Sequence, residues 1–390
     1  MKYCTRCLYP ETKPDIWFDE NGLCSACIAF DARSAIDWKK RETEFVELVS
    51  HIKLNATNPD YDCIIPVSGG KDSHAQIIKA LSYGLKPLAV CATTCHLSKL
   101  GRQNLDNISN LCDLVEITVK RAPRKRINKY ALEVVGDISW PEHQLIFTVP
   151  FNVAEERSIS LILWGENPQN EYGGPKHKHT TNLLDQSWLS EFGGLNGLRL
   201  SDLTDAKIIS GQDANSYRRL HSGWEVKSLY TGYYFPWDGA ENAILASQYG
   251  FKTYNRPVEG VGYDYENLDN LQTGVHDYFK YLKFGFGRCT DLVCNHIRRK
   301  RITRSEGVEI VNTFDGAYPS TYLGVSLEVI LANIGMKIEE FLPICDKFTN
   351  KKLFSLPPRG SRLLRPVPLF TVGGSNDQTS RENMQSEGLR

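Results

Sequence analysis

The stretch that decides the fold is YDCIIPVSGGKDSHAQIIKALSYG, residues 61–84. The apolar run 61–67 predicts a short β-strand, and residues 72–83 predict an α-helix that ends at Gly84. The two glycines between them let the backbone turn tightly and approach an anion without side-chain clash. Because the N–H groups of such a turn and the following helix N-terminus attract negative charge, the stretch predicts a phosphate-binding loop.

Six consecutive residues of this loop are candidate nucleotide ligands: Ser68, Gly69, Gly70, Lys71, Asp72 and Ser73. Lys71 brings a full positive charge to the phosphates, and Asp72 offers the hard oxygen ligand that Mg²⁺ prefers. The loop is not a Walker A motif, since Ile65 stands where that motif needs glycine and Asp72 where it needs Ser or Thr.

The loop does match the pattern SGGxDS, and it resembles the PP-loop of ATP pyrophosphatases such as GMP synthetase, argininosuccinate synthetase and the tRNA-thiolating enzymes. This resemblance implies cleavage of ATP between its α and β phosphates. The loop would hold the leaving pyrophosphate while AMP passes to an oxygen of the substrate. An ordinary Gly-Gly turn between a strand and a helix is the plainer alternative.

Strands and helices alternate beyond the loop. Residues 88–92, 114–119 and 158–164 are further apolar runs that predict strands, and 104–111 predicts a helix. Crossover connections of this kind imply a parallel sheet covered on both faces. The fold class predicted is therefore α/β, a doubly wound parallel sheet of the PP-loop type with a small N-terminal zinc knuckle and a C-terminal helical region.

The domain plan follows from changes of composition. We expect a knuckle over residues 1–30, a linker helix within 31–58, the PP-loop domain over 59–300, a helical region over 301–356 and an extension over 357–390. The linker helix is predicted at 32–54. Residues 168–235 show little periodicity and predict a lid or substrate insertion. Helices are expected at 325–334 and 338–348, the second kinked or split by Pro343, and the polar residues 373–390 are expected to be disordered.

Composition sets limits on location and partners. The chain has 390 residues with 46 Lys+Arg and 46 Asp+Glu, so a dedicated nucleic-acid binder is not expected. Its two basic runs, 120–129 and 298–304, are short and fit solvated helix faces. The sequence lacks an apolar stretch of transmembrane length and an apolar signal core at its N-terminus. We therefore expect a cytoplasmic protein that does not enter a membrane.

Four of the eleven cysteines have the spacing of a metal site. Cys4-x2-Cys7 and Cys24-x2-Cys27 can direct four thiolates at one ion, and a closed tetrahedral site of this kind is structural. Zn²⁺ is the predicted ion, with an iron–sulfur or redox site as the alternative. Among the others, Cys91 and Cys95 follow the second strand, and Cys289 and Cys294 could pair. Simple burial is the more frequent role for such cysteines.

Further blocks narrow the resemblance. Residues 164–169 (WGENPQ) follow the fourth strand, and 284–288 (FGFGR) precede Thr290-Asp291. Blocks 234–238 and 248–252 lie between them. Together with the knuckle, this combination resembles the N-acetyl sugar amidotransferases of O-antigen and flagellin-sugar biosynthesis over roughly residues 1–355. Cys289 stands where a small residue such as Ala is expected, and Cys294 is also unexpected, so both positions depart from the family's pattern.

The resemblance implies that an acetamido group on a nucleotide-linked or acidic sugar becomes an acetamidino group. ATP adenylates the amide oxygen, ammonia attacks the imidoyl carbon, and AMP leaves. Lys283 and Arg288 are candidates to face the α-phosphate, and Glu166 and Asp291 to bind Mg²⁺, position ammonia or accept its proton. Structural salt bridges remain the alternative for these four. Two positions at strand ends, Ala92 and Gly165, are assigned to the nucleotide site, whereas His177 and His179 fit surface-loop residues better than a substrate clamp.

The nitrogen source is expected to be external. A glutaminase needs a cysteine nucleophile, either at the N-terminus or in a Gly-x-Cys-x-Gly turn, and none of the eleven cysteines has either context. The resemblance implies a separate glutaminase subunit and a barrel-type partner that conducts ammonia. A tRNA sulfurtransferase of the PP-loop class is the alternative function, and a zinc-bearing scaffold is a third possibility that would not need an intact SGGKDS.

Overall fold

A computed structural model describes residues 1–167, 171–173, 195–219, 225–355 and 367–368. At its centre lies a five-stranded parallel sheet in the order β3-β2-β1-β4-β5. The chain starts in the middle of the sheet and builds outward on one side and then on the other, which confirms the predicted doubly wound arrangement. The strands are β1 (Cys63–Pro66), β2 (Pro87–Ala92), β3 (Leu114–Ile117), β4 (Leu161–Trp164) and β5 (Lys227–Tyr230).

Alternate residues of each strand point to opposite faces of the sheet and fill two separate cores. On one face Ile64, Val90 and Ile162 pack against α5 (Arg121–Val135) and α6 (Trp140–Glu156). On the other face Ile65 and Leu163 pack against α2 (Trp38–Leu54), α3 (Lys71–Ser82) and α4 (Lys99–Ile108). The short apolar strands of the sequence thus work as a fully covered parallel sheet.

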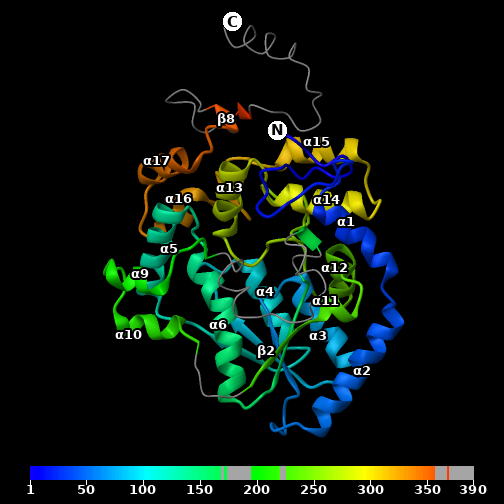
Figure 1. The fold of residues 1–390 in the computed structure, drawn as a ribbon. Helices are drawn as coiled ribbons and strands as arrows, with labels where there is room; N and C mark the ends of the chain where they lie inside the picture. The colour runs from blue at the N-terminus through cyan, green and yellow to red at the C-terminus, as the bar shows by residue number, and fades with distance from the viewer. Residues whose placement is uncertain (168–170, 174–194, 220–224, 356–366, 369–390) are drawn as a thin grey trace, which may run out of the picture.

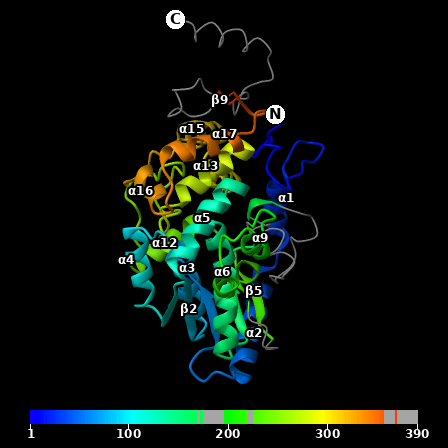
Figure 2. The same cartoon turned by 90° about the vertical axis from the view of Figure 1, so that its left-hand side faces the viewer.

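A second group of helices lies at one end of the molecule. Figure 1 shows these helices together with the N-terminal segment, which carries α1 (Ser25–Ala32), while α2 and β2 extend toward the other end, and Figure 2 shows the same separation from the side. The group has a core of its own. Its helices are α13 (Thr273–Phe284), α14 (Arg288–Arg298), α15 (Arg304–Phe314), α16 (Leu327–Ala332) and α17 (Ile338–Phe348).

Smaller elements complete the fold. Helix α12 (Gly239–Gln248) packs along α3. The remaining short helices are α9 (Leu200–Asp205), α10 (Gly211–Ala214) and α11 (Thr231–Tyr234). Two antiparallel pairs join β6 (Thr321–Tyr322) to β7 (Val325–Ser326) and β8 (Phe354–Ser355) to β9 (Val367–Pro368). Among the described helices, none combines the length and the apolar composition needed to cross a bilayer.

Several predicted boundaries were wrong for local reasons. The helix expected at 32–54 is broken, because Asp37 accepts a hydrogen bond from the Lys40 N–H at 2.9 Å and starts α2 afresh. Helix α4 begins five residues before the predicted 104, since the Ser98 hydroxyl caps it through the Gly101 N–H at 2.8 Å. Helix α17 runs unbroken through Pro343, so the predicted split is wrong.

The stretch 168–235 is more regular than predicted. It contains α9, α10, α11 and the whole of β5, whose four residues are too short a run to stand out in the sequence. Much of it, including His177 and His179, lies outside the described residues, as does the tail 373–390.

Candidate functional site

The predicted phosphate loop forms the link between β1 and α3. Gly69 has φ +86°, and a Cβ at this position would lie 2.9 Å from the backbone nitrogen of Leu105, so only glycine fits. The Ser73 hydroxyl accepts a hydrogen bond from the Ser68 N–H at 3.2 Å. His74 fixes the far side of the turn, with its Nδ1 2.9 Å from the Gly70 carbonyl oxygen. The loop therefore has the tight backbone that phosphate binding requires.

The loop opens at the switch point of the sheet. Strand β1 pairs directly with β4, and the two halves of the sheet diverge from this pair. Gly165 and Glu166 follow β4, so they emerge beside the loop that follows β1. In open α/β sheets, ligands bind outside the carboxyl ends of the strands at such a point. Ala92, the last residue of β2, is half-buried at the end of a neighbouring strand.

Lys71 and Asp72 form the positive and negative centres of the loop. The Lys71 ammonium lies 2.7 Å from the Asp72 carboxylate and also donates to Glu266. Asn242 of α12 donates to the other oxygen of Asp72 at 2.8 Å. Burial opposes a charge on Lys71, but Asp72 and Glu266 outweigh it and raise the lysine pKa above its ordinary value. Lys71, which is only 5% exposed, is thus held charged.

Glu166 is the carboxyl group with the pKa most suited to proton transfer. Removal from water and the negative charge of Asp72 raise its pKa from 4.5 to about 7. A Cβ at the adjoining Gly165 would lie 3.1 Å from the indole of Trp237, so a larger residue there would have to shift that ring by a few tenths of an ångström. A carboxyl group that titrates near neutral pH beside a phosphate loop can act as a general base or as a metal ligand.

Glu266 joins the loop to α14. Its carboxylate accepts from Lys71 and from Arg288, the latter at 2.6 Å. Burial works against its charge, but these two cations prevail and lower its pKa to about 2. Arg288 also lies 3.3 Å from the Tyr172 hydroxyl and 3.6 Å from Asp291. The result is a buried network of alternating charges that spans three distant parts of the sequence.

Asp291 is the far end of this network. It accepts from Lys280 of α13 and, at 3.0 Å, from the Tyr9 hydroxyl. Burial alone would raise its pKa, but Lys280 and Arg288 lower it below the ordinary value. Protein groups therefore already balance the charge of the Asp291 carboxylate and fix its orientation.

The structure brings most of the predicted site residues together but leaves one apart. Lys71, Asp72, Glu166, Arg288 and Asp291 belong to the network, whereas Lys283 does not. The Lys283 ammonium points to the Val135 carbonyl oxygen at 3.4 Å, and burial lowers its pKa. The cation of α13 that reaches the network is Lys280, one turn earlier.

Sequence reasoning also missed Glu266, Asn242 and Lys280. Glu266 lies in the stretch GYDYENL, residues 262–268, where a single Glu among aromatic residues between glycine-rich turns was the available signal. Asn242 and Lys280 carry no local signal, because their roles depend on where α12 and α13 pack.

The four predicted zinc ligands meet at one point. Cys4, Cys7, Cys24 and Cys27 are fully buried, and their sulfur atoms all lie within 4.8 Å of one another. Two of the separations are 3.7 Å (Cys4–Cys27) and 3.5 Å (Cys7–Cys24). A tetrahedral ion with Zn–S bonds of about 2.3 Å requires sulfur atoms roughly 3.8 Å apart. The donor set and its spacing therefore fit Zn²⁺ and leave no position for a substrate.

The cysteine cluster packs directly on α14. The Leu8 N–H points to the sulfur of Cys294 at 3.2 Å, and Tyr9 reaches Asp291 from the same turn. Cys289, five residues earlier on α14, instead approaches the Ile310 carbonyl oxygen at 3.9 Å. The two unexpected cysteines of this helix thus point to different neighbours, which gives no support to the pair considered from the sequence.

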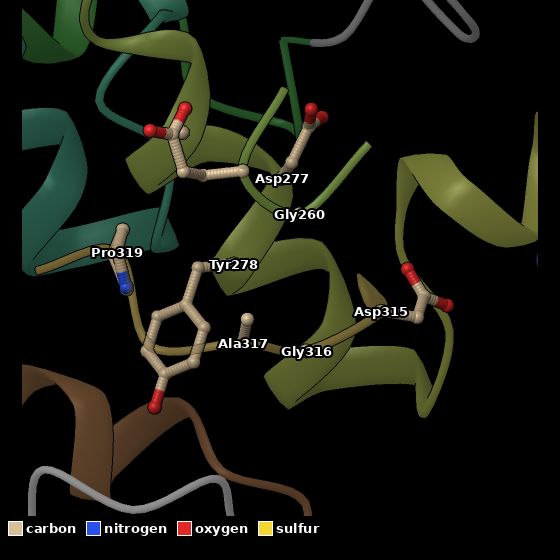
Figure 3. Close-up of a pocket in the computed structure, with 9 residues that line it drawn as sticks. Gly260, Asp277, Tyr278, Asp315, Gly316, Ala317 and Pro319 are labelled. Carbon is tan, nitrogen blue, oxygen red and sulfur yellow. The ribbon is translucent and has the colours of Figure 1, made fainter. Parts of the chain in front are cut away.

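Two hollows lie near the network. A groove of about 880 Å³ is bordered by Trp237 and by four arginines, Arg6, Arg33, Arg298 and Arg299. A cavity of about 10 Å³ behind α13 has room for one water molecule. Figure 3 shows this cavity, with Tyr278 along one side and Asp277 and Asp315 on different sides of it. The groove is large enough for a substrate and the cavity is not.

Comparison with known protein families gives one match in the C-terminal half of the chain. Residues 229–358, about a third of the sequence, match the family described as LPS biosynthesis protein WbpG-like, C-terminal domain. The match contains Asn242, Glu266, Lys280, Arg288 and Asp291. No curated protein matches the chain significantly. A solved structure, NMN synthetase from Francisella tularensis, is similar at 16% identity over 45% of this chain and 79% of that one, with a TM-score of 0.28.

Proposed function

We propose that this protein is the ATP-dependent synthase subunit of an amidotransferase that converts an acetamido group of a sugar into an acetamidino group. The observation that carries the proposal is the meeting of an intact SGGKDS loop with a charge network built largely from the WbpG-like region. Neither part alone would indicate this reaction. A loop of this kind serves several ATP-dependent chemistries, and the family description names lipopolysaccharide biosynthesis.

The residues suit a reaction in which negative charge accumulates on phosphate. Lys71 is a buried cation and Arg288 a half-buried one on two sides of Glu266, and phosphate oxygens of ATP can compete with Glu266 for both. Asp72 and Glu166 are the oxygen donors that would hold Mg²⁺, which supplies charge neutralisation at the phosphates. Adenylation forms a bond between the amide oxygen and the α-phosphorus and breaks the α–β bridge, so pyrophosphate leaves.

The second half of the reaction needs a base. Ammonia adds to the imidoyl carbon, AMP departs with the former amide oxygen, and one proton must be lost for each turnover. Glu166, with a pKa of about 7, is the group in the network best able to accept that proton. Because the chain offers no glutaminase signature, we propose that a partner glutaminase and an ammonia-conducting barrel protein supply the nitrogen. Consumption of ATP also fits a cytoplasmic enzyme.

The groove beside Trp237 is the proposed place for the sugar. Trp237 packs over Gly165, next to Glu166, and the groove continues from there along Phe30 and Trp38. Aromatic rings suit the apolar face of a sugar or a base. The arginines that border the groove already pair with protein groups, Arg33 and Arg299 with Glu171, so a carboxylate or diphosphate of the substrate would take the place of such a partner. These features support an acidic or nucleotide-linked acetamido sugar as the substrate.

The alternative, a tRNA sulfurtransferase, needs an accessible thiolate. Burial raises the pKa of Cys91 to about 12 and also raises the pKa of Cys95. Cys289 is fully buried. The cysteines considered for sulfur transfer are therefore poor nucleophiles, which favours the amidotransferase.

The test is an assay of AMP and pyrophosphate release by the purified chain. Nucleotide-linked acetamido sugars, their uronic acid forms and bulk tRNA are each offered with ammonium at raised pH or with glutamine. We expect release with an acetamido sugar and ammonium, and a product in which NH has replaced oxygen by mass. Release that requires tRNA and a sulfur donor would replace this proposal with the alternative, and efficient turnover with glutamine alone would remove the glutaminase partner.

A further inference from the structure

Three potential metal ligands meet where the turn between α5 and α6 packs against α13. Asp137 lies in the turn between α5 and α6, His143 lies on α6, and His276 lies on α13. Their ligand atoms are all within 4.8 Å of one another. His276 Nδ1 is 2.9 Å from one oxygen of Asp137, and His143 Nδ1 is 3.4 Å from the other. We call these three residues the Asp137 cluster.

The carboxylate at its centre is rigidly held. The side chain of Asp137 is 2% exposed, and it also accepts from the Ser139 N–H at 2.8 Å and from the Asn196 amide at 3.3 Å. The carboxylate is thus held in one orientation by four neighbouring groups.

The histidines leave the cluster open on one side. Their side chains are 23% (His143) and 30% (His276) exposed, and the two rings stand edge to face with centroids 5.1 Å apart. A tetrahedral ion with bonds of about 2.0–2.1 Å places neighbouring ligand atoms roughly 3.4 Å apart. The spacing already present therefore needs little change to admit an ion, which would displace the protons shared between the imidazoles and the carboxylate.

We propose that Asp137, His143 and His276 form a second metal site that takes a divalent ion of the Zn²⁺ class. Two imidazoles and one carboxylate suit Zn²⁺ and its neighbours rather than Mg²⁺ or Ca²⁺, which prefer oxygen ligands. Three protein ligands leave at least one coordination position open, unlike the closed cysteine cluster. The ion would also tie the α5–α6 turn of the sheet domain to α13 of the WbpG-like region.

Co²⁺ separates the two sites by spectroscopy. Cobalt bound to thiolates gives intense charge-transfer absorption, whereas cobalt bound to nitrogen and oxygen gives only weak visible bands. Titration of the metal-free full chain should therefore show two equivalents, one with thiolate bands and one without. His276→Gln and His143→Gln should each lose the second equivalent and keep the first, and His51→Gln, an exposed histidine on α2, should keep both.

Thermal unfolding gives the second measurement. Zn²⁺ added to protein already loaded with one equivalent should raise the Tm of the native chain and of His51→Gln but not of either cluster variant. Retained thiolate bands show that a variant is folded. A single equivalent in the native chain, or a second equivalent that survives both cluster substitutions, would overturn the proposal. Neither measurement depends on the amidotransferase reaction.

Discussion

The cysteine cluster and the charge network around Lys71 lie against each other, but they are built in opposite ways. The cluster takes all four ligands from residues 4–27, so its geometry depends on two short turns. The network draws Lys71, Glu166, Glu266 and Arg288 from segments separated by up to about 200 residues, so its geometry depends on how the whole fold packs. Local spacing can specify the first kind of site, whereas only tertiary structure completes the second.

The largest expected effect is on the network. Lys71→Ala and Asp72→Ala should each lower AMP formation by about 10²–10³-fold, because each removes a charged group of the proposed phosphate site. The measurement is pyrophosphate release with an acetamido sugar and ammonium. Lys79→Ala on the same helix is the control, since Lys79 lies over Phe235 and away from the loop. Unchanged turnover in both loop variants would refute the PP-loop assignment.

Substitution in the cysteine cluster should act on stability first. Purified protein should carry zinc at the cysteine cluster. Cys4→Ser or Cys27→Ser should release this zinc and destabilise the chain by several kcal/mol. Metal analysis and the Tm report this change. Cys112→Ser, at a half-buried position away from the cluster, is the matched control. An unaltered metal content in the cluster variants, or the visible absorbance of an iron–sulfur cluster, would argue against zinc.

The same contrast explains what could be predicted. The loop, the order of strand and helix, and the knuckle follow from contiguous patterns in the sequence. Strand β5 escaped notice because a four-residue strand in a polar stretch has no periodicity. Lys283 was predicted as a site residue and Lys280 was not considered, because the sequence does not show which side of α13 faces Asp291. Glu266 escaped notice because its two partners lie 195 and 22 residues away.

Acid should weaken the network through Glu266. Its pKa is lowered from 4.5 to about 2, so its charge stabilises the fold above pH 4.5, and this stability is lost as the pH falls toward 2. The shift corresponds to roughly 3 kcal/mol. Glu266→Gln should therefore be less stable at neutral pH and should lose less stability between pH 4.5 and 2, as measured by denaturant unfolding. Glu116→Gln, which breaks a half-exposed ion pair with Arg102, should lose as much stability between pH 4.5 and 2 as the native protein does.

The pKa of Glu166 predicts a pH dependence of the chemistry. Its ionised form, the one that would hold Mg²⁺ during adenylation, appears as the pH rises through about 7, so the ATP–pyrophosphate exchange supported by an acetamido sugar should rise over the same range. Exchange needs no ammonia, so the titration of ammonium does not confuse the profile. Glu166→Gln should lower the rate of exchange by about 10-fold and abolish its rise with pH. If the exchange rate of the variant still rises over the same pH range, a group other than Glu166 is responsible for the rise.

The smallest expected effect concerns the contact between the cysteine cluster and the charge network around Lys71. Tyr9→Phe removes only the hydroxyl that donates to Asp291 at 3.0 Å, and a hydrogen bond to a charged group contributes about 1.5–3 kcal/mol. Asp291 keeps Lys280 and Arg288, so we expect turnover to fall only two- to five-fold. Zinc content should stay the same, because Tyr9 is not a ligand. Tyr61→Phe, which removes an exposed hydrogen bond to Asp113, is the control and should have no effect on turnover.

If Tyr9→Phe turns over at the native rate, the knuckle is a separate structural unit. A selective loss of turnover would show instead that the closed metal site also helps to hold Asp291 in place.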